Sequence, residues 1–371
     1  MGTCPLSKDV IQQIVQHYIN THGYPYAPQQ NDALRSISTC RTAVLGGTKI
    51  VCGDCGHEQY LYKSCGNRNC PQCNSIKQLK WKEARSSEFI QVTYFHAVFT
   101  VPSQLHELFL AHPKKCYNAL FKAVSETLLT LAADPKHLDA RIGFVCVLHS
   151  WGANLSFHPH LHVMIPGCGL NHLNKLVTPK GNFLFPVKVM SSLFRGKLLD
   201  ELKRLSLDDS IDYRTLYNKD WVVYLKESMP GSKHVVDYLS RYTHKIAITS
   251  KRIVSRDSES VTFRYKDYRD HNKVKEMTLS EEEFMRRYLL HVLPKGFTRI
   301  RFYGLLSNRS KKDALDLIRR LLNQTPPEDR LKNRSVFEIL TLLFGDRYCC
   351  CRKCGSKNLS QITVSPVLHP E

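Results

Sequence analysis

The chain has 371 residues, with 53 lysine and arginine residues against 33 aspartate and glutamate residues, which gives a formal net charge of +20. This excess is spread along the chain and is typical of proteins that bind polyanions, of which nucleic acid is the commonest, although solubility alone is a simpler explanation. No run of about 18 apolar residues is present and residues 1–10 lack a signal-peptide pattern, so we expect a cytoplasmic protein with no membrane span.

A helix is expected at residues 8–22, where apolar side chains recur at helical spacing and Gly23 follows as a stop. Cysteines then dominate the pattern. The chain contains 14 of them. In a chain without a signal sequence such a number indicates bound metal or free thiols more often than disulfides.

Two CxxC pairs close together indicate a structural zinc site, because each pair makes a tight turn that directs two thiolates at one tetrahedral ion. The predicted ligands are the four cysteines of these pairs: Cys52, Cys55, Cys70 and Cys73. Cys65 lies between the pairs and is the first substitute. Cys40 and His57 are also available in this segment.

Several cations follow or flank the second CxxC pair, Arg68 among them. A zinc-binding module surrounded by positive charge is a candidate domain for recognising DNA ends, and Arg68 is a candidate DNA contact. The alternative is a purely structural knuckle that supports its neighbour. We therefore expect residues 1–88 to form a small, helical N-terminal domain that binds zinc and DNA.

The following part, residues 89–310, carries the pattern of an antiparallel sheet. Strands are expected at residues 91–101, 141–149 and 157–165, with a long helix at 104–132. This order, with short links, favours an α+β fold with helices on one face over a doubly wound parallel sheet. The later elements expected are helices at 189–205, 231–245, 280–291 and 312–322, strands at 221–225 and 297–303, and a hairpin at 253–266.

The last part, residues 311–371, is expected to be a helical region followed by a cysteine-rich tail. Four cysteines lie in this tail: Cys349, Cys350, Cys351 and Cys354. One CxxC pair without a partner pair is weak evidence for metal, although Cys349 could complete a site.

Histidines cluster on the two strands expected at 141–149 and 157–165. His160 and His162 alternate around Leu161, so both imidazoles leave the same face of a strand. If the two strands pair as a hairpin, His149 comes alongside this face and becomes the third ligand of a metal ion. His158 lies on the same face but nearer the loop, and we expect it to be a spectator. An isolated buried histidine is more often structural than catalytic, but three at these spacings favour a metal site.

Three imidazoles leave coordination positions open for a phosphate oxygen and water. Imidazole suits Mn, Zn, Ni or Co, whereas Mg prefers oxygen ligands and is held when substrate phosphate completes its shell. We expect Mg or Mn, acting as a Lewis acid on a phosphodiester.

The helix expected at 231–245 carries a candidate nucleophile. Tyr238 and Tyr242 lie four residues apart, on one face, with the cations Arg241 and Lys245 beside them. The simpler reading is an aromatic stripe that packs on the sheet. A tyrosine that attacks DNA phosphate would instead conserve the bond energy in a phosphotyrosine link.

Together these motifs resemble the HUH endonucleases and, more narrowly, the two-tyrosine rolling-circle transposases of the insertion-sequence-ninety-one type. The similarity extends from about residue 10 to about residue 310 and follows the family's motif order. It rests on four segments: residues 40–47 (CRTAVLGG), 64–73 (SCGNRNCPQC), 157–162 (FHPHLH) and 238–243 (YLSRYT).

The resemblance implies an RRM-like or ferredoxin-like HUH sheet, cleavage of single-stranded element ends, a covalent 5′-phosphotyrosine and strand transfer to a target DNA. Some family members carry histidine where this chain has Thr48 and Asn69, which favours an all-cysteine zinc site here. Oligomerisation is left open.

Two other functions fit the same motifs. One is an HUH nickase that acts as a plasmid replication initiator or relaxase, which the cysteine module before the histidine strands disfavours. The other is a non-catalytic zinc DNA-binding protein, which the intact histidines and tyrosines disfavour. A carboxylate-based transposase is disfavoured because no carboxylate constellation is recognisable.

Overall fold

The computed structural model describes residues 9–367 except 87, 182, 230–246, 268–269, 327 and 346–348. The chain forms two compact units that are not consecutive in sequence. The first unit comprises Met1–Ala84, His244–Val292 and Asp329–Glu371, and the second comprises Arg85–Thr243 and Leu293–Glu328. The expected division into a zinc-binding part (1–88), a catalytic part (89–310) and a tail (311–371) concerns function, and it remains a prediction.

In the first unit, α1 (Val10–His22) packs against α2 (Pro28–Thr39) and α9 (Glu281–Leu289). The helix expected at 8–22 is confirmed, and it begins where the Asp9 carboxylate accepts a hydrogen bond from the Ile11 amide at 3.0 Å. Its apolar stripe includes Ile11, Ile14 and Val15, all of which are buried. The unit also contains α3 (Asn74–Ser86), at whose end the chain passes into the second unit, and α11 (Val336–Phe344).

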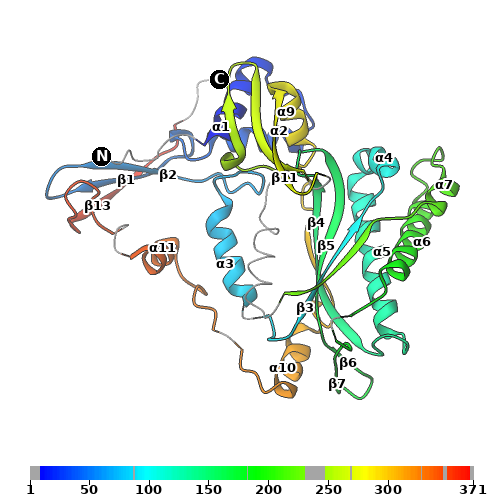
Figure 1. Cartoon of the computed structure of the whole chain (residues 1–371). Helices are drawn as coiled ribbons and strands as arrows, with labels where there is room; N and C mark the ends of the chain where they lie inside the picture. Colours follow the sequence, from blue (N-terminus) through cyan, green and yellow to red (C-terminus); the bar gives the residue numbers. More distant parts are fainter. Residues whose placement is uncertain are drawn as a thin grey trace. The chain divides into compact units, whose positions relative to one another are not determined.

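The described part of the first unit also contains two antiparallel sheets. One has the order β13-β1-β2, with β1 (Gly47–Cys52), β2 (Glu58–Tyr62) and β13 (Leu359–Val364). The C-terminal strand therefore lies beside an N-terminal hairpin (Figure 1). The other sheet consists of β9 (Ile253–Arg256), β10 (Ser260–Asp267) and β11 (Lys273–Ser280), so the hairpin expected at 253–266 is confirmed and gains a third strand.

The second unit is built on an antiparallel sheet with the central order β12-β4-β5-β3-β8. The bounds of its strands are β3 Tyr94–Thr100, β4 Arg141–Trp151, β5 Phe157–Pro166, β8 Val223–Met229 and β12 Ile300–Gly304, and the short strands β6 (Gly169–Leu170) and β7 (Leu176–Val177) extend it beside β4. The three strands expected at 91–101, 141–149 and 157–165 are confirmed. The α+β class with antiparallel sheets is confirmed as well.

Helices α5 (Pro113–Ala133) and α6 (Val187–Leu205) lie side by side along this sheet (Figure 1). The single helix expected at 104–132 is divided into α4 (His106–Ala111) and α5, because Pro113 lacks the amide hydrogen that a continuous helix needs. Among its described residues the unit also contains α7 (Tyr213–Asn218) and α10 (Lys311–Leu321). None of the described helices is long and apolar enough to cross a membrane.

Strand alternation separates the core of the second unit from its histidines. Leu148 on β4 and Leu161 on β5 belong to the hydrophobic core that α5 and α6 cover. Their neighbours His149, His160 and His162 therefore leave the opposite face of the sheet. The fold thus gathers the imidazoles on the face away from the main core.

Candidate metal centres

The hairpin of β4 and β5 brings three histidines together. His149 lies directly opposite His160 in the strand register, and His162 follows two residues further along β5. The three side chains are buried, with relative exposures of 3%, 8% and 8%. One ring nitrogen of each lies within 4.8 Å of the others. The juxtaposition expected from the sequence is therefore present.

The hydrogen bonds of His160 define which nitrogen is free. Nδ1 of His160 lies 2.7 Å from the carbonyl oxygen of His158, so Nδ1 must carry the proton and donate. Burial lowers the pKa of His160 to about 4, so the ring is neutral near pH 7. Nε2 consequently presents a lone pair. It lies 3.1 Å from Nε2 of His162.

This spacing fits a shared metal ion. Two nitrogens bound at about 2.1 Å to one ion are separated by about 3.0 Å in octahedral and about 3.4 Å in tetrahedral geometry. The observed 3.1 Å between the Nε2 atoms of His160 and His162 falls in this range. An all-nitrogen set of neutral imidazoles suits Mn, Zn, Ni or Co, and it accepts Mg only with oxygen ligands from elsewhere.

His96 on β3 extends the group and was not anticipated from the sequence. Its Nε2 lies 2.9 Å from Nδ1 of His162, and the two rings stack with an interplanar angle of 6°. Burial, followed by the charge of Lys226, lowers the pKa of His96 to about 4. A neutral His96 can accept a hydrogen bond from Nδ1 of His162, and in that tautomer Nε2 of His162 carries the lone pair that a metal ligand needs.

A cluster of four cysteines lies in the first unit: Cys40, Cys65, Cys70 and Cys73. The sulfur of Cys73 is 3.3 Å from that of Cys40 and 3.4 Å from that of Cys65. These distances are close to the separation of about 3.8 Å between thiolates on one tetrahedral zinc, given a Zn–S bond of about 2.3 Å. Cys40 is fully buried, and Cys65, offered above as a substitute, is part of the set.

The predicted grouping of Cys52 and Cys55 with Cys70 and Cys73 is wrong. Cys52 and Cys55 lie at the far end of the β1–β2 hairpin, in a second cluster with Cys351 and Cys354. The first cluster takes Cys40 from before this hairpin and its other three cysteines from after it. Strand β1 has 6 residues. At about 3.3 Å per residue, the two ends of this strand lie roughly 17 Å apart.

Comparisons with known proteins agree with this geometry. Residues 10–101 match the family model "Transposase zinc-binding domain", and residues 143–314 match the model "Putative transposase". The chain is 42% identical over 316 residues to "Putative transposase y4qJ" of Sinorhizobium fredii, which covers 80% of this chain and 79% of that protein. The chain belongs to the IS91-type transposase family. A second relative is "Transposase for insertion sequence element IS801" of Pseudomonas savastanoi pv. phaseolicola, 27% identical over 315 residues, or 80% of this chain and 75% of the relative.

The zinc-binding domain of this IS91-type transposase contains all of the first cysteine cluster and half of the second. The other match contains the three clustered histidines. It also spans Tyr238 and Tyr242 with their flanking cations Arg241 and Lys245. These four residues lie outside the described residues, so their roles remain predictions.

Arg68, the predicted DNA contact of the zinc-binding domain, is half-buried. Burial lowers the pKa of its guanidinium from the usual value, but arginine remains charged near neutral pH. Its contact with DNA remains a prediction.

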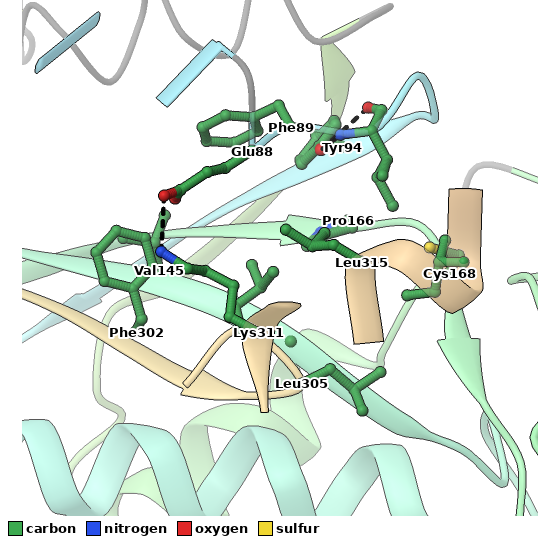
Figure 2. A pocket seen from close by; sticks show the side chains of 14 residues that line it. Glu88, Phe89, Tyr94, Val145, Pro166, Cys168, Phe302, Leu305, Lys311 and Leu315 are labelled. Carbon is green, nitrogen blue, oxygen red and sulfur yellow. Dashed lines mark hydrogen bonds and ion pairs between the residues drawn. The ribbon is translucent and has the colours of Figure 1, made fainter. Parts of the chain in front are cut away.

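An apolar pocket lies apart from both kinds of metal centre. It lies in the second unit, where Tyr94, Val145, Phe302 and Leu315 line it together with other side chains. Figure 2 shows Glu88 and Lys311 facing each other across it, joined by an ion pair of 2.7 Å. Apolar walls with this paired charge indicate that the pocket is a packing site between α10 and the sheet that includes β12.

The residues missed from the sequence share one property, which is that their partners are distant in the chain. His96 lies within the strand expected at 91–101, and pairing that strand with 157–165 would have placed it diagonal to His162. Cys40 was one of several available ligands. Cys351 and Cys354 formed a CxxC pair whose partner pair lay about 300 residues earlier.

Proposed function

We propose that this IS91-type transposase nicks single-stranded DNA at the ends of an insertion sequence and transfers the cut strand to a target. The observation that carries the proposal is the set of three histidine nitrogens within 4.8 Å of one another on one face of the sheet. A metal centre of this composition, in a transposase, suits activation of a phosphodiester. The HUH arrangement of the sheet is part of this proposal.

His149, His160 and His162 would hold the metal ion, which we expect to be Mg or Mn. When bound, the ion supplies Lewis-acid polarisation of the scissile phosphate. The protein keeps two of these rings in the tautomer that a metal ligand needs, His160 through the carbonyl of His158 and His162 through His96. All three rings are buried, which limits the access of competing water to the centre.

Tyr238 or Tyr242 is the proposed nucleophile. Its phenolic oxygen attacks the phosphorus, the bond from phosphorus to the 3′ oxygen breaks, and a 5′-phosphotyrosine and a free 3′-hydroxyl result. The phenol has a pKa near 10, so its proton must leave during attack, and the adjacent cations Arg241 and Lys245 would favour the phenolate. One phosphoester replaces another, so rejoining to a target hydroxyl needs no ATP.

Two tyrosines allow a hand-off between strands. While one holds a cut end as a phosphotyrosine, the other can cleave a second strand without releasing the first.

The zinc-binding domain, with Arg68, would recognise the element ends. Positive charge along the chain would hold the backbone of both DNA partners.

The decisive experiment incubates the full-length protein with single-stranded element-end DNA and Mn²⁺, then maps the covalent adduct by mass spectrometry. We expect an adduct at Tyr238 or Tyr242 that EDTA abolishes and that the Tyr238→Phe/Tyr242→Phe double variant cannot form. Tyr224→Phe is the matched control, because Tyr224 is half exposed on β8 of the same unit, outside the proposed nucleophile pair. An adduct formed by the double variant, or one insensitive to EDTA, would disprove the mechanism.

A further inference from the structure

The second cysteine cluster joins two turns of the same design from opposite ends of the chain. Cys52–Gly56 and Cys351–Gly355 each have the pattern CxxCG. In each, the amide of the glycine donates to the carbonyl of the first cysteine, at 3.0 Å for Gly56 and 2.8 Å for Gly355. Both glycines have positive φ, 65° and 78°, which favours glycine there. Each turn is thus a knuckle that points two thiols outward from a tight bend.

The four sulfur atoms have the spacing of a tetrahedral zinc site. Sγ of Cys52 is 3.6 Å from that of Cys354, and Sγ of Cys55 is 3.6 Å from that of Cys351. Thiolates on one zinc ion lie about 3.8 Å apart, whereas a disulfide requires about 2.05 Å. The four cysteines are free thiols. Because the first cysteine of each knuckle faces the second of the other, the two knuckles are arranged in an approximately two-fold manner.

The surrounding backbone holds the knuckles in place independently of any ion. The register of β1 with β13 sets Cys52 opposite Leu359. The Gly53 amide donates to the Asn358 carbonyl at 2.9 Å, and the Asn358 side chain donates to Asp54 at 2.7 Å. A Cβ at Gly53 would lie 2.5 Å from the Asn358 side chain, so a larger residue there would displace the amide that donates to Asp54. The site is therefore preorganised for a metal ion.

From these observations we infer that Cys52, Cys55, Cys351 and Cys354 bind a second structural zinc ion, which fastens the C-terminal strand β13 to the N-terminal hairpin. Cys351 and Cys354 lie beyond both family matches, which end at residues 101 and 314. The zinc-binding domain, whose family match covers residues 10–101, would thus take two further zinc ligands from the C-terminal part of the chain. The side chains of Arg352 and Lys353 in the second knuckle would offset the negative charge of a zinc ion with four thiolates.

The test counts zinc in the full-length protein carrying His160→Ala and His162→Ala, so that only the cysteine sites contribute. We expect two zinc ions per chain by elemental mass spectrometry. Adding Cys351→Ser and Cys354→Ser should remove one of them and speed tryptic cleavage at the exposed Lys357 several-fold. Cys349→Ser/Cys350→Ser is the matched control and should keep both ions, because these neighbours lie outside the cluster.

A conservative exchange separates ligand loss from misfolding. Cys354→His retains a zinc-binding side chain on the exposed corner of the cluster, and it should keep two ions. One zinc per chain in the starting protein, or two in the Cys351→Ser/Cys354→Ser variant, would overturn the inference. Disulfides between the knuckles, detected by non-reducing peptide mapping of protein purified under reducing conditions, would overturn it too. None of these measurements depends on DNA cleavage.

Discussion

Nε2 of His96 lies 2.9 Å from Nδ1 of His162, and the two rings are nearly parallel. The pair has a direct counterpart in other metal centres, where the second nitrogen of a ligating histidine is held by a carboxylate or a carbonyl. Here a neutral imidazole takes that position. It makes His96 a positioning residue for His162 rather than a ligand.

We therefore predict that His96→Ala weakens metal binding without removing the centre. Loss of the partner of a ligating histidine typically costs about 10- to 100-fold in metal affinity. The concentration of Mn²⁺ that gives half-maximal covalent adduct should rise by about that factor, while the yield at saturating Mn²⁺ recovers. His96→Asn retains a hydrogen-bond acceptor, so its half-maximal Mn²⁺ concentration should lie between those of the unmodified protein and of His96→Ala. An unchanged Mn²⁺ dependence would contradict this role.

His158 and His160 should behave differently although they are two residues apart on one strand. His160 contributes its Nε2 to the centre, whereas the group of His158 that accepts the hydrogen bond from His160 is its main-chain carbonyl. We predict that His160→Ala abolishes adduct formation and that His158→Ala leaves it within about threefold of the unmodified protein, since its carbonyl is retained. The comparison is made at saturating metal. A loss in His158→Ala as complete as in His160→Ala would show that its ring takes part.

Local pattern was sufficient to predict that the three histidines lie together, because two alternating strands paired as a hairpin place His149 on the same face as His160 and His162. The strands and helices that were anticipated are those with an apolar face. By contrast, β13 and β11 present mostly exposed or half-exposed side chains, so they have no apolar alternation to detect. Their positions depend on pairing with other strands.

The cysteine grouping illustrates the same limit. Spacing identified the CxxC turns correctly but could not assign their partners, because each four-cysteine set is completed by a residue on the other side of a hairpin or at the other end of the chain. The tyrosine pair could be recognised from the sequence alone through a family resemblance, and its geometry lies outside the described residues.

Lowering the pH should reduce the stability of the first unit, in part because Glu283 becomes protonated. Its carboxylate oxygens lie 2.6 Å from one guanidinium nitrogen of Arg286 and 2.6 Å from one of Arg287. The hydrogen bonds from Arg286 and Arg287, and the positive charges of the two arginines, lower the pKa of Glu283 to about 2. The folded-state pKa is below the unfolded value near 4.3, so the contribution is present above that value and disappears as the pH falls toward 2. Since the group is partly exposed, we expect about 1 kcal/mol at neutral pH.

Urea unfolding of the full-length protein and of Glu283→Gln measures this contribution. The difference in the unfolding midpoint of the first unit should be constant from pH 8 to about pH 5 and should shrink below it, because the glutamate then becomes protonated. Glu276→Gln is the control, as Glu276 pairs with Arg264 on an exposed part of the neighbouring sheet. A difference that grows as the pH falls would contradict the assignment.

Cys40 provides the sharpest test of the first cysteine cluster, because it precedes the CxxC pairs and lies 3.3 Å from Cys73 through space. We predict that Cys40→Ser removes one zinc ion and lowers the thermal midpoint substantially, since serine does not replace a thiolate ligand and a structural zinc contributes directly to folding. Cys116→Ser is the matched control: Cys116 is equally buried but belongs to neither cluster, so its zinc content should be unchanged. His57→Ala should also retain full zinc, because neither described cluster includes His57. Retention of zinc by Cys40→Ser together with its loss in His57→Ala would reverse the ligand assignment.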